Sequence, residues 1–133
     1  MRDILFRGKR KDNGEWVEGF YICVGEKYHY ILTGKLNLTK YGAEFEKYRV
    51  YSDTVGQFIG LMDKNGTKIF EDDIVEFPYL NPCSGNKETN RGEVIYSSEI
   101  AAFTVEGDYL LGELSELKVI GNIHDNPELL EVK

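Results

Sequence analysis

Two Asn-Gly pairs, each set between segments rich in apolar residues, constrain the fold of this chain more than any other feature. The first is Asn13-Gly14 and the second is Asn65-Gly66. Asn and Gly readily adopt the positive φ angles that tight β-hairpin turns require. The sequence therefore predicts two β-hairpins. Their paired segments are 4–9 with 16–24, and 55–61 with 67–70.

The rest of the chain has the composition of a β protein. It carries 9 Tyr, 7 Phe and 14 Gly among 133 residues, and residues that suit a pleated, half-buried surface dominate over helix formers. We expect a mainly β fold, with an N-terminal β lobe, a C-terminal β lobe and a short helix at Asn126-Pro127. The segment 78–91 reads as a long polar loop, and no assignment is made for 35–47. Further strands are predicted at 28–33, 74–77, 92–97, 101–106 and 118–123.

Charge divides the chain into two parts. Residues 1–52 contain 10 basic and 7 acidic side chains, a net +3, whereas residues 53–133 contain 6 and 16, a net −10. We therefore predict two lobes, 1–52 and 53–133, which can share one core. A strongly acidic second lobe favours a basic protein partner or a second copy of the chain, and it disfavours phosphate backbones.

The sequence lacks the features of membrane, secreted and disulfide-stabilised proteins. It contains no run of 18 apolar residues and no apolar segment of a secretory signal after Met1. The two cysteines, Cys23 and Cys83, are expected to be free thiols in a reducing compartment. We expect a cytoplasmic protein without a membrane anchor.

Candidate catalytic groups are few. The acidic triplet Glu71-Asp72-Asp73, with His124, could bind a hard cation or transfer protons, which makes a metal-dependent enzyme the least favoured alternative. Adjacent acidic residues between strands more often form a solvated corner that prevents edge pairing. No nucleophile motif or phosphate-binding glycine loop is present. We expect no enzymatic activity, no catalytic residue, no resident metal and no cofactor.

One basic cluster makes nucleic-acid binding an alternative function. Arg7, Lys9, Arg10 and Lys11 lie in the lobe that carries most of the tyrosines. Cations next to aromatic faces can hold single-stranded nucleic acid, although such clusters are usually solvated edges. A variant of this alternative is that the acidic lobe mimics DNA and occupies a host enzyme.

Three separated motifs resemble a known family. They surround the first turn, the second turn and the C-terminal Asn-Pro. They read ILFRGK with NGEWVEG (residues 4–9 and 13–19), VGQFIGLMDKNGTKIFEDDIV (55–75) and VIGNIHDNPELL (119–130). Together, and in this order, they resemble the YopX family of phage and prophage proteins. Where the family pattern has Gly-Asp before Ile-Val, this chain has Asp72-Asp73.

The resemblance implies a fold rather than an activity. It implies an SH3-like β-barrel in the C-terminal lobe and an origin in a phage or prophage of a bacterial host. It transfers no catalytic or binding residue, because the matching positions are turn and core residues. We therefore expect a non-enzymatic protein-binding or assembly module, with a protein partner or a second copy as its ligand.

Overall fold

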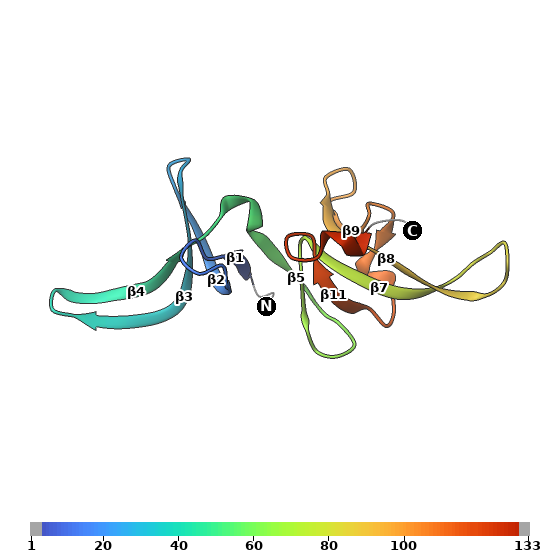
Figure 1. Ribbon diagram of the computed structural model, residues 1–133, viewed down its shortest axis with the longest axis horizontal. Helices are drawn as coiled ribbons and strands as arrows, with labels where there is room; N and C mark the ends of the chain where they lie inside the picture. Colours follow the sequence, from blue (N-terminus) through green and yellow to red (C-terminus); the bar gives the residue numbers. More distant parts are fainter. Residues whose placement is uncertain (1–3, 131–133) are drawn as a thin grey trace. The chain divides into compact units, whose positions relative to one another are not determined.

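The computed structural model describes residues 4–130 and is built mainly from antiparallel strands (Figure 1). It forms two compact units, of which one ends at Phe58 and the next begins at Ile59. The mainly β fold predicted from composition is confirmed. In the part of the chain that is described, no helix is long and apolar enough to cross a membrane.

The first unit contains four strands, a 3₁₀-helix and the start of a fifth strand. In space the strand order is β4-β3-β2-β1-β5, with every neighbouring pair antiparallel. Figure 1 shows β3 and β4 as a long hairpin that extends beyond β1 and β2. The elements are β1 (Phe6–Lys9), β2 (Trp16–Val24), β3 (Tyr28–Thr39), β4 (Gly42–Arg49), the 3₁₀-helix η1 (Ser52–Thr54) and β5 (Gly56–Met62).

The second unit contains the later residues of β5, its hairpin partner β6, and a five-stranded sheet of order β10-β9-β8-β7-β11. Its apolar core is centred on fully buried side chains of β7, β8 and β9. The elements are β6 (Lys68–Phe70), β7 (Asp73–Leu80), β8 (Lys87–Ser97), β9 (Ala102–Val105), β10 (Tyr109–Leu110), the 3₁₀-helix η2 (Leu111–Glu113), β11 (Lys118–Asn122) and the 3₁₀-helix η3 (Pro127–Leu130). The core residues are Ile69, Val75, Phe77, Val94, Val105, Leu111 and Leu117.

The five-stranded sheet does not close into a barrel. Its edge strands in the described residues are β10 and β11, which do not pair with each other. The SH3-like barrel implied by the family resemblance is therefore not confirmed. The short helix expected at the C-terminal Asn-Pro is a single 3₁₀ turn, Pro127–Leu130.

Two segments differ from the sequence predictions. The unassigned segment 35–47 forms the outer part of the β3–β4 hairpin, and much of the predicted loop 78–91 is strand, because β7 continues to Leu80 and β8 begins at Lys87. Pro78 is tolerated because β11 pairs with β7 only as far as Glu76. Beyond that point β7 has a neighbour on one side, where Pro78 lies opposite Thr89.

Candidate functional site

The register of β2, β3 and β4 places apolar, aromatic and basic side chains on one face of the first unit's sheet. Residues directly opposite each other on antiparallel strands project to the same face. The pairs that form this face are Phe20–Leu32, Ile22–Tyr30, Val24–Tyr28, Tyr30–Arg49, Leu32–Lys47 and Leu36–Phe45. Apolar side chains from three strands are thereby brought together.

The opposite face of the same strands carries the unit's packing. Ile31 is fully buried there, and the Tyr21 hydroxyl lies 2.6 Å from Nδ1 of His29. Burial, followed by the bond to Cys23, raises the pKa of Tyr21. Tyr48, also on this face, donates its hydroxyl hydrogen to Glu46. The unit's core therefore lies on this side of the sheet, and the face described above is turned to solvent.

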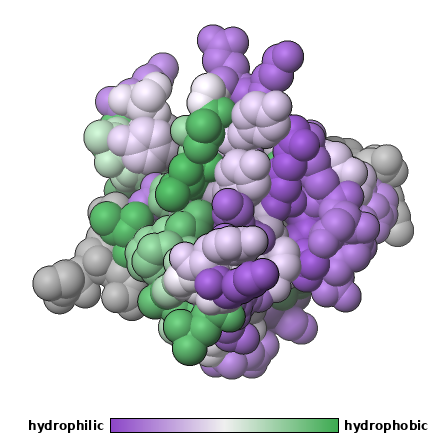
Figure 2. Space-filling model, turned by 90° about the vertical axis from the view of Figure 1, so that its left-hand side faces the viewer, coloured by the Kyte–Doolittle hydropathy of each residue, from purple (hydrophilic) through white to green (hydrophobic). Residues whose placement is uncertain are grey.

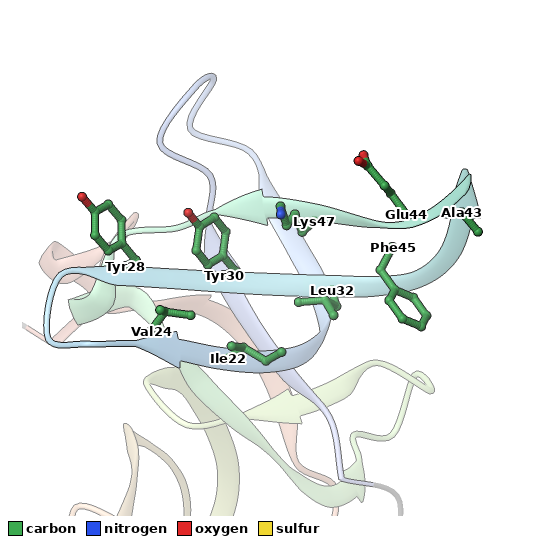
Figure 3. A pocket seen from close by; sticks show the side chains of 9 residues that line it. All are labelled: Ile22, Val24, Tyr28, Tyr30, Leu32, Ala43, Glu44, Phe45 and Lys47. Carbon is green, nitrogen blue, oxygen red and sulfur yellow. The ribbon is translucent and has the colours of Figure 1, made fainter. Parts of the chain in front are cut away.

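The exposed face is hollowed into a groove of about 610 Å³, which we call the β2–β4 groove (Figure 3). Val24, Tyr28 and Phe45 in its lining are 55%, 45% and 57% exposed. Figure 2 views the molecule from the side of the β3–β4 hairpin and shows a band of apolar side chains next to polar ones. The lining residues are Ile22, Val24, Tyr28, Tyr30, Leu32, Ala43, Glu44, Phe45 and Lys47.

Two cations of β4 lie on the tyrosine rings of β3. The Arg49 guanidinium carbon is 4.9 Å from the ring centre of Tyr28, and the Lys47 ammonium is 5.7 Å from that of Tyr30. At exposed positions each contact of this kind contributes about 0.5–1 kcal/mol. The contacts hold positive charge at the side of the groove. Among the lining residues that the structure describes, Glu44 carries the negative charge.

The groove is bordered by β4, the edge strand of the sheet. The backbone N–H of Lys11 donates to the carbonyl of Arg49 at 2.9 Å, so Arg49 directs its carbonyl away from β3. Alternate residues of a strand direct their backbone groups to the same edge. By this alternation Lys47, Phe45 and Ala43 also direct their backbone groups outward. The turn after β1 covers the end of β4 at Arg49.

Each residue of the predicted basic cluster lies against an aromatic ring. Arg7 and Lys9 lie 4.7 and 5.8 Å from the Trp16 ring, whereas Lys11 lies 5.5 Å from the Tyr51 ring. Arg10 lies 3.9 Å from the ring of Tyr48 and donates hydrogen bonds to both carboxylate oxygens of Asp12. The hydrogen bonding to Asp12 is the main reason why the pKa of Arg10 is raised. The four cations are thus divided among three aromatic rings.

The predicted acidic triplet is divided as well. Asp73 is 1% exposed and accepts the backbone N–H of Phe70 at 2.8 Å. Asp72 has a φ of 71° and lies 3.0 Å from Nε2 of His124, while Glu71 is half-buried. The side chains of this triplet therefore serve different local contacts.

Glu93 lies within electrostatic range of Asp72, Glu106 and His124. Burial, then the charges of Asp72 and Glu106, raise the pKa of Glu93, and His124 opposes the shift. Among residues 4–130, no group of three or more His, Cys, Asp or Glu side chains is arranged to hold a metal ion. Both thiols are exposed and free.

Comparison with known proteins identifies the family. The sequence matches the family described as YopX protein over residues 5–131. The chain belongs to the YopX family. A crystal structure of protein EF1440 from Enterococcus faecalis is similar, with 27% identity and a TM-score of 0.64 over 98% of this chain and 100% of that one. A search of curated proteins finds no match.

Two of the sequence motifs that resemble the family stabilise turns and close packing in the second unit. Asp63, at the second Asn-Gly turn, accepts the backbone N–H groups of Asn65, Thr67 and Val119 at 2.9, 2.9 and 3.0 Å, which ties the turn to β11. In the C-terminal motif, a Cβ added to Gly121 would lie 2.6 Å from the side chain of Asn126. Neither motif contributes to the β2–β4 groove.

Sequence reasoning missed the groove residues of β4. The period of two that marks them begins at Ala43 and continues through Phe45, Lys47 and Arg49, all within or next to the unassigned segment 35–47. Acidic residues at 44 and 46 alternate with them, and this pattern is a signal for a strand.

Proposed function

We propose that this YopX-family chain is a non-enzymatic protein-binding module whose partner binds the β2–β4 groove. The observation that carries the proposal is the exposed apolar surface formed by Ile22 and Val24 on β2 and Phe45 on β4, the two strands on either side of β3. Soluble proteins rarely leave a contiguous apolar patch open unless it binds something. Covering such a patch stabilises a complex by about 25 cal/mol for each Å² of apolar surface removed from water.

The composition of the groove supports binding rather than catalysis. Its only charged lining residues in the described chain are Glu44 and Lys47, next to two tyrosines. His is the most frequent general acid or base, and Ser and Cys are common nucleophiles, but none of these residue types lines the groove in the described part of the chain. We further propose, from the family resemblance, that the chain comes from a phage or prophage and acts in the bacterial cytoplasm.

Variants on the groove test this function. The chain and its Phe45→Ser and Ile22→Ser variants would be used to capture proteins from a lysate of a bacterium that carries the gene. Ile100→Ser is the matched control, because Ile100 is 54% exposed and lies in the second unit. We expect one specific partner to bind the wild type and the control and to be lost from both groove variants. Equal capture by all four proteins would reject the groove.

A second candidate function is the binding of single-stranded nucleic acid. The observation that favours it is the placement of Arg49 and Lys47 on Tyr28 and Tyr30, because cations and stackable rings on one surface suit such a strand. This function predicts an affinity that falls steeply with salt and is lost in Lys47→Glu/Arg49→Glu. The aliphatic groove residues have no role in it, so protein binding remains the leading proposal.

A further inference from the structure

We propose that the β2–β4 groove and the free edge of β4 together receive an extended segment of another protein, added to the sheet as a further strand. The bound segment carries an acidic side chain opposite Lys47 and apolar side chains opposite Phe45 and Ala43. This inference rests on the proposed protein-binding function and names the chemistry of the partner.

The backbone of β4 provides the first argument. Its outward N–H and C=O groups belong to Ala43, Phe45 and Lys47, next to the Arg49 carbonyl that accepts from Lys11. An extended peptide that pairs with an exposed edge strand gains main-chain hydrogen bonds, and side-chain pockets then give specificity. The residues of β4 before Arg49 offer such an edge. At Arg49 the edge is occupied, because the backbone of Lys11 in the turn after β1 bonds to it.

The side chains of the same residues provide the second argument. Ala43, Phe45 and Lys47 themselves line the groove (Figure 3). Lys47 lies opposite Leu32, a lining residue of β3. A strand paired with β4 therefore places every second side chain over the groove. Apolar side chains at these positions would cover Phe45, which is 57% exposed.

The positive charges of β4 provide the third argument, and they indicate where the bound segment carries its acidic residue. Lys47 and Arg49 lie two residues apart on β4, and both are held on β3 tyrosines. Opposite charges on facing strands stabilise pairing, and like charges destabilise it. Glu44 lines the groove five residues before Arg49, so an acidic side chain fits opposite Lys47 and is disfavoured next to Glu44.

A second copy of this chain is a poor occupant of the edge. Two β4 strands related by a two-fold axis must pair antiparallel, with side chains of the same face opposite each other. Every such register centred on residues 44–47 puts like charges opposite: Glu44 on Glu44, Glu44 on Glu46, Glu46 on Glu46 or Lys47 on Lys47. Beyond this range the Lys11 backbone or the hairpin end limits the pairing. The partner is therefore a different protein.

Peptide selection on the full chain tests the inference. A displayed library of random linear peptides about ten residues long would be selected on wild type and counter-selected on Phe45→Ser. We expect enrichment of an acidic residue with apolar residues two and four positions away. Peptides without this period, or no enrichment over the counter-selection, would overturn the inference.

Two measurements on a selected synthetic peptide establish its pairing with β4. Lys47→Glu should weaken binding about tenfold, and replacing the peptide's acidic residue by lysine should restore it, whereas Lys87→Glu in the second unit should change nothing. N-methylation of alternate peptide amides should abolish binding in one phase of the alternation and spare the other. Tolerance of methylation in both phases, or no rescue by the exchanged charge, would overturn strand addition.

The outcomes separate this inference from the function beneath it. If a captured partner is lost from the Phe45→Ser variant but the selected peptides lack an acidic residue, the groove binds protein and the inference fails. If the groove variants capture the partner as well as the wild type does, both the proposed function and this inference fail. A concentration-dependent dimer that Phe45→Ser disperses would assign the face to a second copy. Binding of an oligothymidine that Lys47→Glu abolishes would assign it to nucleic acid. Either result would overturn the inference.

Discussion

The carboxylate of Asp63 explains why the second Asn-Gly turn is held in place. Asp63 is 7% exposed and accepts three backbone N–H groups, two from its own turn and one from Val119 on β11. Burial by itself would raise the pKa of Asp63. The three backbone donors and the charge of Lys118 outweigh burial and lower the pKa.

We predict that Asp63→Asn lowers the free energy of unfolding by about 2 kcal/mol at neutral pH, because the amide turns an N–H group toward one of the backbone donors. A carboxyl group whose pKa is lowered by folding stabilises the native state at every pH above its pKa in the unfolded chain. That stabilisation is lost as the pH falls below about 4 and through the folded pKa. Urea unfolding of both proteins between pH 7 and pH 3 measures this.

The two unfolding curves should converge at acidic pH. A constant difference between wild type and Asp63→Asn over the whole range would contradict the role assigned to the charged carboxylate. Lys64→Gln serves as the control, because the contact of Lys64 with Leu117 is made through its backbone N–H and does not depend on the side chain.

Asp72 occupies a position where the family resemblance led us to expect glycine, and its backbone conformation is one that glycine adopts easily. Its φ of 71° lies in the left-handed region, which asparagine and aspartate tolerate better than most residues. Its side chain also lies 3.0 Å from His124. The aspartate therefore combines an adverse backbone conformation with a stabilising side-chain contact.

We predict that Asp72→Ala destabilises the protein by about 1–2 kcal/mol, since alanine keeps the adverse φ and loses the contact with His124. Asp72→Gly should recover about 1 kcal/mol of this loss, because glycine adopts positive φ without a penalty. Thermal and urea unfolding of the three proteins measure both steps. Equal stability of the alanine and glycine variants would show that the φ angle carries no cost here.

At the scale of elements, the packing of β2 against β3 depends on Gly19. A Cβ at this position would lie 2.0 Å from the carbonyl oxygen of Leu32, which is a backbone atom that cannot turn aside. We predict that Gly19→Ala destabilises the first unit by about 2 kcal/mol or more. The control is Gly112→Ala, because a Cβ at Gly112 meets nothing within 4 Å.

The readout of this pair is partner binding as well as stability. Because β2 and β3 line the β2–β4 groove, Gly19→Ala should weaken binding of any ligand of the groove, and Gly112→Ala should leave it unchanged. Unaltered unfolding of Gly19→Ala would mean that β2 and β3 can separate at this point without cost.

The predicted strands reproduce the structure where a local turn or a period of two is strong. The segment 16–24 after the first Asn-Gly turn is the whole of β2, and 118–123 differs from β11 by one residue. The groove could not be predicted in the same way. A strand such as 16–24 has one buried and one exposed face, but alternation alone does not say which face the core covers. The exposed apolar face follows from tertiary packing around Ile31 on the other side.

The missed strands have a different cause. Register between β3 and β4 shifts between Leu32 and Leu36, where Gly34 has a φ of 90°, so no single period runs through 35–47. At β7, Pro78 is a residue that normally ends a strand, and it is accepted because only one neighbour pairs with it. Long-range pairing decides both cases, and it is not visible in a local pattern.

At the scale of the molecule, the two units differ in how much apolar surface they bury. Among residues 4–130, the first unit has three buried apolar residues, Ile31, Val50 and Phe58, whereas the core of the second joins seven buried residues from several strands. Stability follows apolar burial, and regions with few buried contacts open more readily. The unit that carries the β2–β4 groove is therefore expected to be the less stable one.

We predict that amide hydrogens in β2–β4 exchange with solvent at least about tenfold faster than those in β7 and β8. Hydrogen exchange followed by mass spectrometry measures both sets in one experiment. A groove ligand should slow exchange in the first unit selectively, because it binds only the native form of that unit. If β2–β4 and β7–β8 instead exchange at one common rate, with and without ligand, then the whole chain opens as a single cooperative body. In that case the apolar groove face would not lower the stability of the strands that carry it.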